Sequence, residues 1–379
     1  MKNLILIIAL SFSFLNSTFS QSDAVTELIR TYAETLPNKA EVAIGYIQNG
    51  ELKTVGYHKK DGELIAVENQ NDVFEIGSIS KTFTAYLLAE QVVNGKVKMD
   101  TPIKNLLSDP TMQTALMNEI TLQQLVTHTS GLEASPNTFI KPFLRAKFGN
   151  ADNPYKFIQW KHFEKYLRDG ELASAPGEQW TYNNAGFGLL GKLLADQEQT
   201  TWESLVETNI FEKYGMKNTY PTGANVPREL FVQGYDIDGQ TSRYWDMDFV
   251  NPAGSIKSSA ADMLQWLSLH VQATDDPIFK VLKTKTEIDT HWKGSKMGNG
   301  WIHKMTADQH ITWHGGATGA FRSFSAFDEA SQTAVVILTN FYHRYPKMRD
   351  ANGKSLIRTY GFEIMDLLSA EAEILSNAN

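Results

Sequence analysis

Phe74-Glu75-Ile76-Gly77-Ser78-Ile79-Ser80-Lys81 is the stretch that decides the fold of this chain. It places a hydroxyl and an amine three residues apart where a helical pattern begins, and the turn dipeptide Asn94-Gly95 ends that pattern. Residues three apart on a helix share a face, so we expect Ser78 and Lys81 to lie side by side in the first turn.

This pair has the composition of a nucleophile and its base. A helix start carries free backbone N–H groups and the positive end of the helix dipole, which stabilise a negative oxygen developing at Ser78. Lys81 can accept the serine proton if burial suppresses its charge. The alternative is an ordinary helix cap followed by a solvated lysine. The chain has no other S-x-x-K and the flanks of this one are apolar, which favours the catalytic interpretation.

Composition excludes several classes of protein. The 379 residues are 42% hydrophobic, enough for a substantial core in one large domain with an insertion or in two domains. A formal net charge of −8 argues against a nucleic-acid partner. There is no cysteine, so thiol catalysis and disulfides are excluded. The nine histidines are scattered without H-E-x-x-H, and we expect neither a metal nor another cofactor.

Residues 1–20 have the pattern of a secretory signal peptide. Lys2 gives a charged start, residues 4–15 form a short apolar run, and small residues precede Gln21, where cleavage is expected. The run is shorter than the ~20 residues that a membrane span needs. We therefore expect residues 21–379 to form an exported protein, periplasmic or secreted, with no membrane anchor after cleavage.

Strand patterns occupy both ends of the chain. A hairpin around Asn49-Gly50 precedes Ser78, and strands from Ile311 to Thr339 are followed by a closing helix at Leu356 to Leu368. Helical patterns fill the middle, where Ile120 to Leu132 is expected to be a helix ended by Gly131.

This order predicts an α/β (α+β) fold. We expect an antiparallel sheet built from both chain ends, about residues 21–95 and 241–379, with flanking helices. A mainly helical subdomain at about residues 96–240 lies against the sheet.

Three motifs carry a family resemblance. Phe74 to Lys81 resembles the active-site signature of class C β-lactamases, within the wider family of penicillin-recognising serine hydrolases and D,D-peptidases. The family's Y-x-N motif is matched at Tyr182-Asn183-Asn184, and its basic-x-Gly strand motif at His314-Gly315-Gly316. The motifs stand in the family's order, so the resemblance covers essentially the whole chain after residue 20 and implies a β-lactamase/D,D-peptidase-like fold.

The resemblance implies a role for each residue. Ser78 attacks a carbonyl carbon, and Lys81 and Tyr182 share the transfer of its proton to the leaving group. Which of these two is the primary base stays open, because a phenol with a pKa near 10 is a poor base without cationic neighbours. Asn184 orients Lys81 and the substrate amide. The N–H groups of Ser78 and Ala317 form an oxyanion hole, worth roughly 3–4 kcal/mol per donor.

The third motif departs from the class C pattern. His314 stands where β-lactamases usually carry lysine, and Gly315 stands where they usually carry a hydroxyl residue, with Gly316 completing the motif. Histidine is mostly neutral at pH 7, so its attraction for a penicillin carboxylate should be weaker. Arg322 and Asn340 could compensate as carboxylate contacts, and surface charge and a turn cap are the alternatives for them.

The expected enzyme is an exported serine hydrolase most like a class C β-lactamase, acting on a small-molecule or peptide substrate. One alternative keeps the mechanism and changes the substrate, giving a D,D-peptidase, D-amino-acid amidase or carboxylesterase. Another is a penicillin-binding sensor that is acylated but does not hydrolyse. The absence of G-x-S-x-G argues against an α/β-hydrolase. The oligomeric state is open, with a monomer favoured.

Overall fold

The computed structural model describes residues 21–107, 120–149, 153–236, 238–273, 275–306, 309–341, 349 and 355–378. The expected signal peptide, residues 1–20, lies outside the described residues. Within the described part, no helix combines the length and the apolar character that crossing a bilayer requires.

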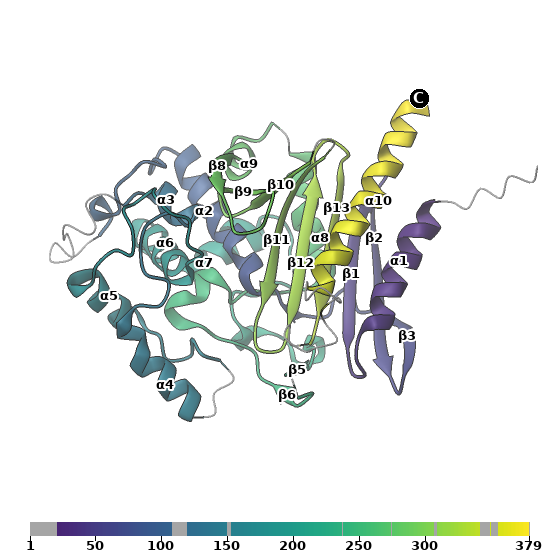
Figure 1. Ribbon diagram of the computed structural model, residues 1–379, viewed down its shortest axis with the longest axis horizontal. Coiled ribbons are helices and arrows are strands. Elements are labelled where there is room, and N and C mark those ends of the chain that lie inside the picture. Colours follow the sequence, from purple (N-terminus) through teal and green to yellow (C-terminus); the bar gives the residue numbers. More distant parts are fainter. Residues whose placement is uncertain are drawn as a thin grey trace, which may run out of the picture.

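One antiparallel sheet joins the two ends of the chain (Figure 1). Its nine strands follow the order β3-β2-β1-β13-β12-β11-β10-β9-β8. The strands are β1 Glu41–Gln48, β2 Glu51–Lys60, β3 Glu63–Val67, β8 Lys285–Asp289, β9 Ser295–Gly298, β10 Ile302–Met305, β11 His310–Ala317, β12 Arg322–Asp328 and β13 Thr333–Thr339. In the central pair, Ile44 of β1 lies opposite Ile337 of β13. The predicted sheet from both chain ends is therefore confirmed.

Helices cover both faces of this sheet. α8 (Ala260–Gln272) packs on β1 and β13 from one side, and α10 (Leu356–Ala378) packs on β12 and β13 from the other, beside α1 (Gln21–Thr35). All seven residues of β13 are buried, because apolar side chains are needed on both faces of a covered strand. The closing helix was expected to end at Leu368 and continues ten residues further.

The helical part lies to the left of the sheet in Figure 1. It contains α2 Ser80–Val93, α3 Leu122–Val126, α4 Ile140–Phe148, α5 Trp160–Asp169, α6 Asn184–Gln197 and α7 Trp202–Val206. α9 (Pro277–Leu282) lies beside β8 and packs on α2. Short ladders, β4 (Phe74–Glu75) with β7 (Lys257–Ser258) and β5 (Gly234–Tyr235) with β6 (Thr241–Ser242), tie the loops of the helical part together. One apolar core fills the space between this part and the sheet, and a second lies beneath α1 and α10.

The predicted helix over residues 120–132 is wrong in its length. α3 begins with a Thr121–Gln124 capping box and ends after Val126. His128 follows with a φ of +61°, in the left-handed region that ends a right-handed helix. Its carbonyl accepts a hydrogen bond from the Thr181 N–H at 2.8 Å, so the turn joins this segment to the loop before Tyr182.

Candidate active site

Ser78 lies where the helical part meets strand β11. β4 leads into a 3-10 turn at Gly77–Ile79, and α2 follows directly from Ser80. Gly77 has a φ of +52°, and a Cβ on it would lie 2.6 Å from the backbone nitrogen of Ala317. A Cβ on Gly316 would lie 1.9 Å from the Ile76 carbonyl oxygen. Both positions need glycine, because backbone meets backbone here without an intervening side chain.

Lys81 is fully buried and its amine contacts three oxygens. Its Nζ lies 3.1 Å from Ser78 Oγ, 2.8 Å from Asn184 Oδ1 and 2.7 Å from the Ala253 carbonyl oxygen. The Asn184 amide is oriented by its other end, which donates to the Tyr155 hydroxyl at 2.9 Å. The pair predicted from the S-x-x-K pattern is thus in hydrogen-bond contact, and Asn184 lies beside it as expected.

The burial of Lys81 lowers its pKa well below the ordinary lysine value. A neutral amine has two N–H bonds and one lone pair. The carbonyl oxygens of Asn184 and Ala253 can only accept, so they take the two N–H bonds. In the neutral form the remaining lone pair faces the Ser78 hydroxyl, 3.1 Å away, which is the geometry of a base that takes the serine proton.

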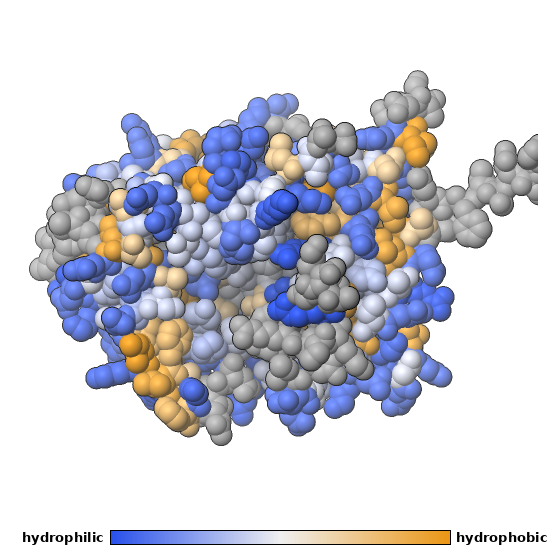
Figure 2. All heavy atoms as spheres, in the orientation of Figure 1, coloured by the Kyte–Doolittle hydropathy of each residue, from blue (hydrophilic) through white to orange (hydrophobic). Residues whose placement is uncertain are grey.

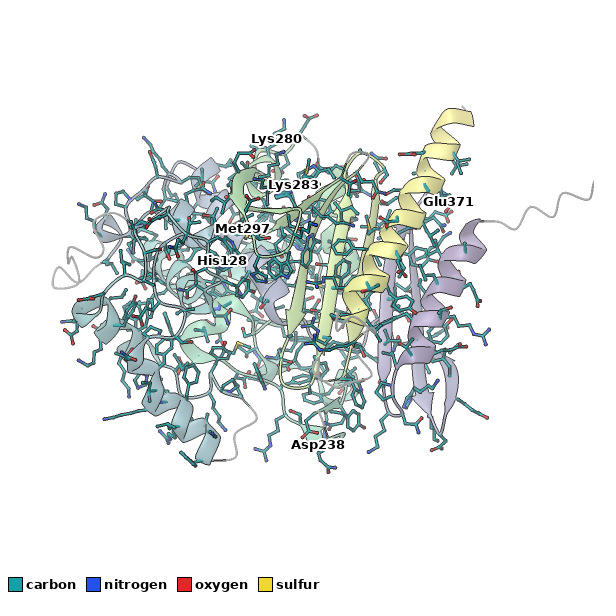
Figure 3. The ribbon with its side chains drawn as sticks, viewed as in Figure 1. His128, Asp238, Lys280, Lys283, Met297 and Glu371 are labelled. Carbon is teal, nitrogen blue, oxygen red and sulfur yellow. The ribbon has the colours of Figure 1, made fainter. Side chains whose placement is uncertain are left out.

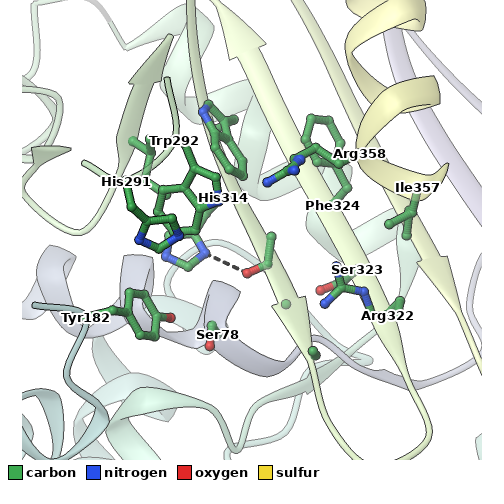
Figure 4. Close-up of a pocket in the computed structure, with 15 residues that line it drawn as sticks. Ser78, Tyr182, His291, Trp292, His314, Arg322, Ser323, Phe324, Ile357 and Arg358 are labelled. Carbon is green, nitrogen blue, oxygen red and sulfur yellow. Dashed lines mark hydrogen bonds between the residues drawn. The ribbon is translucent and has the colours of Figure 1, made fainter. Parts of the chain in front are cut away.

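Tyr182 reaches the same point from the loop before α6. The Lys81 amine lies 4.7 Å from the centre of its ring, and Figure 4 shows the Tyr182 and Ser78 hydroxyls facing the same space. Burial raises the pKa of Tyr182, although a hydrogen bond with Ser78 opposes the shift. The phenol is therefore protonated at neutral pH, so it can donate a proton in the cycle but cannot be the resting base.

His128 supports this loop and was missed by the sequence reasoning. Its Nδ1 accepts the Asn183 N–H at 3.1 Å, and its ring centre lies 4.5 Å from that of Tyr182. Figure 3 shows it between the helical part and the sheet. Burial lowers its pKa well below the ordinary value, so the ring is neutral. The only sequence signal was a histidine in the polar run after Val126, which no motif singles out.

His314 lies on β11 and is neutral as well. Its Nδ1 donates to the Gly315 carbonyl oxygen at 2.9 Å, and burial lowers its pKa to about 3. With the proton on Nδ1, Nε2 carries a lone pair, and no described side chain donates to it. His314 therefore cannot supply the positive charge that a lysine would supply at this place.

A pocket of about 310 Å³ opens between these groups (Figure 4). Such a volume is at the small end of those that bind small molecules. It is lined by Ser78, Tyr182, His291, Trp292, Ile302, Trp313, His314, Gly315, Gly316, Ala317, Arg322, Ser323, Phe324, Ile357 and Arg358. Most of the predicted site residues thus share one pocket, with Lys81 and Asn184 directly behind Ser78.

Two arginines form the far end of this pocket. Arg322 comes from β12 and Arg358 from the first turn of α10. The Arg322 guanidinium donates to Ser355 Oγ at 3.3 Å, but its Nε is buried with no acceptor among the described residues. Desolvation and the neighbouring Arg358 lower the pKa of Arg322 to about 10, so it is still charged at pH 7. Sequence reasoning proposed Arg322 and missed Arg358.

Asn340, proposed as a carboxylate contact, has another place in the structure. It is buried, its Oδ1 accepts the Glu41 N–H at 2.7 Å, and its Nδ2 donates to the Gln233 carbonyl oxygen at 2.8 Å. It is absent from the pocket lining. Its amide joins β1, β13 and the loop before β5, which leaves it no free donor for a substrate.

A buried carboxylate braces the segment around Ala317. Glu75 accepts hydrogen bonds from Thr318 Oγ1 at 2.6 Å and from the Trp245 N–H at 2.6 Å. Its charge is paired with Lys257 at 3.4 Å, and both side chains are fully buried. Glu75 therefore connects the residue after Ala317 to the segment that leads into Ser78.

Comparisons with known proteins show which family and which fold this chain resembles. A family model described as Beta-lactamase matches residues 29–357. A beta-lactamase of Pseudomonas fluorescens is 26% identical over 352 residues, which make up 83% of this chain and 93% of that protein. A solved class C beta-lactamase has a TM-score of 0.73 at 19% identity, covering 91% of this chain and 96% of the other.

A second solved structure bears the name Beta-Lactamase/D-Alanine Carboxypeptidase and comes from Pseudomonas syringae. It has a TM-score of 0.72 at 21% identity, covering 90% of this chain and 99% of the other. These likenesses confirm the predicted fold class.

Proposed function

This chain belongs to the beta-lactamase family, and from that premise we propose that Ser78 opens the amide of a β-lactam. Membership makes the chain a serine hydrolase that works through an acyl-enzyme; the choice of substrate and of residues is the proposal. The observation that carries it is the fully buried Lys81, whose Nζ lies 3.1 Å from Ser78 Oγ and whose pKa burial lowers well below the ordinary value.

In the proposed acylation, Ser78 Oγ forms a bond to the carbonyl carbon while its proton passes to Lys81 Nζ. The oxyanion lies between the N–H groups of Ser78 and Ala317. When the tetrahedral intermediate collapses, the C–N bond breaks and the Tyr182 hydroxyl gives its proton to the leaving nitrogen. Lys81 then returns its proton to Tyr182, so both groups recover their starting states.

Deacylation uses Lys81 as the base again, with Ser78 as the leaving group. Water attacks the carbonyl carbon of the ester and passes a proton to Lys81. The bond to Ser78 Oγ breaks, and the proton on Lys81 returns to that oxygen. The product leaves as a carboxylic acid, which gives the second proton of the water to the solvent, and the enzyme is restored.

The arginine end of the pocket supports an anionic substrate. Arg322 and Arg358 face the pocket, and no described carboxylate pairs with either of them. Arginine binds carboxylates through two parallel N–H bonds, which are stronger than neutral hydrogen bonds. A β-lactam and a D-alanyl peptide both carry a carboxylate close to the scissile amide, whereas a simple ester carries none. We therefore assign the carboxylate to the arginines and not to His314.

The neutral His314 favours a second candidate, a D,D-peptidase of the same family. A histidine with its Nε2 lone pair toward the pocket can accept a hydrogen bond, and a peptide N–H is a donor that a β-lactam nitrogen lacks. The two names borne by the Pseudomonas syringae structure are consistent with one scaffold serving both substrates. We further propose export to the periplasm, on the pattern of residues 1–20 alone.

The test compares three substrates on one preparation: a chromogenic cephalosporin, a D-Ala-D-Ala peptide and a p-nitrophenyl ester. Turnover of the cephalosporin supports the leading proposal, and turnover of the peptide alone supports the second. Turnover of the ester alone would contradict both. Intact-mass analysis after mixing with a penicillin separates turnover from a sensor, because a persistent adduct on Ser78 would show acylation without hydrolysis.

A further inference from the structure

Helix α4 presents an apolar stripe to the solvent on the helical part of the molecule. Ile140, Leu144 and Phe148 are four residues apart, and 51%, 46% and 79% of their surfaces are exposed. This spacing places the three side chains on one face of the helix. The stripe is visible over α4 in Figure 2. Single exposed apolar residues are ordinary, but three in line on one short helix form a surface that suits a partner.

The opposite face of α4 is anchored. Pro142 and Ala146 are buried, and the half-buried Phe143 packs its ring against those of Phe139 and Tyr155, with centres 6.1 and 6.2 Å apart. The helix is therefore held in one rotation about its axis. The outward direction of the apolar stripe follows from this packing and not from a loose end.

Cations stand on both sides of the stripe. At 100° per residue, Lys147 lies on one flank, and Lys141 and Arg145 lie on the other. All three side chains are exposed, and α4 contains no acidic residue. Arg145 is held by the ring of Phe157, with the guanidinium 4.2 Å from the ring centre.

We propose that α4 docks on the surface of an anionic phospholipid bilayer. The three apolar side chains would enter the interface, while the flanking lysines and arginine keep their charges at the level of the headgroups. The whole chain is acidic, but at physiological salt the Debye length is about 8 Å, so the charges near α4 decide the local attraction. This contact is peripheral and agrees with the expectation of no anchor after cleavage.

Two other occupants fit less well. A second copy docking through the same face would bring the three cations of each helix against those of its partner. A protein groove would have to enclose a protruding ridge that ends in the exposed ring of Phe148. A fluid interface with negative headgroups satisfies both the charges and the shape.

The experiment is co-sedimentation with vesicles of the chain that begins at Gln21, which contains every described helix and strand. Starting there removes the apolar residues 4–15, which would bind lipid themselves. Vesicles of mixed phosphatidylglycerol and phosphatidylcholine are compared with vesicles of phosphatidylcholine alone. We expect binding to the mixed vesicles only, weakening as salt is raised.

Two variants separate the apolar and the charged contributions. Leu144→Ser with Phe148→Ser should abolish sedimentation. Lys141→Gln with Lys147→Gln should weaken it by about fivefold for each cation removed. The matched controls are Ile374→Ser, a 56% exposed apolar residue of α10, and Lys280→Gln on α9, which Figure 3 places far from α4. Both controls should bind vesicles like the unchanged protein.

The turnover of any active substrate should be the same in all variants, which shows that each has folded. Failure of the unchanged protein to bind mixed vesicles at moderate salt would overturn the proposal, and so would equal binding by the α4 variants. A dimer in solution that Phe148→Ser dissociates would also overturn it, because the face would then join two copies.

Discussion

The two ends of the pocket differ in how they stabilise a positive charge: burial opposes the charge of Lys81, whereas Arg322 stays charged. At one end, behind Ser78, Lys81 contacts three oxygens and is so deeply buried that its pKa falls well below the usual value. At the other end Arg322 keeps its charge, although its Nε has no acceptor among the described residues. The desolvation of the lysine favours its neutral form, which can take a proton. The arginine stays charged, and the partner that it lacks is one that a substrate can bring.

Removing the nucleophile Ser78 should have the largest effect on activity. Ser78→Ala should lower the turnover of every substrate by roughly 10⁴-fold or more, whatever the charge of the substrate. Unchanged circular dichroism and melting temperature would show that the fold is intact. Residual turnover of one substrate class close to the normal rate would mean that another nucleophile serves that class.

Replacing Lys81 should lower the activity nearly as much. Lys81→Met should slow acylation by about 10²- to 10⁴-fold, the usual contribution of a general base. In the unchanged enzyme only neutral Lys81 accepts the proton. We therefore expect kcat/KM to rise with pH through the lowered pKa of Lys81 and to level off well below 10.5. If the logarithm of kcat/KM still rises with unit slope up to pH 10, the pKa of Lys81 is not lowered.

Tyr182→Phe tests whether the Tyr182 hydroxyl donates the proton to the leaving nitrogen. The leaving nitrogen would lose its proton source, so turnover of an amide should fall on the order of 10²-fold. An ester with a good leaving group should be affected much less, because p-nitrophenolate needs no proton. Equal losses on amide and ester would assign Tyr182 to Ser78 activation instead, and no loss at all would remove it from the mechanism.

Arg322 and Arg358 should affect the binding of the substrate carboxylate and therefore KM. Arg358→Gln should raise KM about tenfold for a substrate with a carboxylate, since a hydrogen bond to a charged group contributes roughly 1.5–3 kcal/mol. KM for a neutral ester should stay the same. Lys304→Gln is the matched control: this lysine contacts Phe362 on α10 with its amine 4.2 Å from the ring centre and does not line the pocket. If both variants behave alike, the arginine end has no role in recognition.

Replacing Glu75, which bonds to the residue after Ala317, should have the smallest effect on the rate. Glu75→Gln keeps the shape of the side chain but removes the buried carboxylate that lies nearest to Lys257, so that only the exposed Asp246, 3.8 Å away, still pairs with its charge. We expect the free energy of unfolding to fall by about 3 kcal/mol and kcat to fall several-fold with little change in KM. A loss of stability with an unchanged kcat would restrict Glu75 to a structural role.

The sequence was sufficient for the parts of the site that lie in compact motifs. Ser78 and Lys81 are fixed by one helical turn, and Tyr182, Asn184 and His314 each stand in a short pattern that could be found by its order in the chain. The sheet from both chain ends followed from strand patterns with local turns. Each strand and each motif is short enough to be found from neighbouring residues, and the family resemblance indicated that the motifs belong to one site.

The rest depends on contacts between distant residues. Arg358 is one basic residue among many until α10 packs over β12 and brings it to Arg322. The Ala253 carbonyl, which takes one N–H of Lys81, belongs to a backbone that no sequence pattern marks. Asn340 ends its strand as expected, but its side chain is occupied by Glu41 and Gln233, which are far away in the chain. Tertiary packing decides each of these.

The contact of Gly77 and Gly316 with the opposing backbone has a consequence for biosynthesis. Ser78 leaves the ribosome well before β11 (His310–Ala317), the strand that completes its surroundings. A growing chain therefore carries its reactive serine without the means to use it. Acylation can begin only after the two distant glycines have met, so the enzyme is chemically silent until β11 has been made and has folded against Ser78.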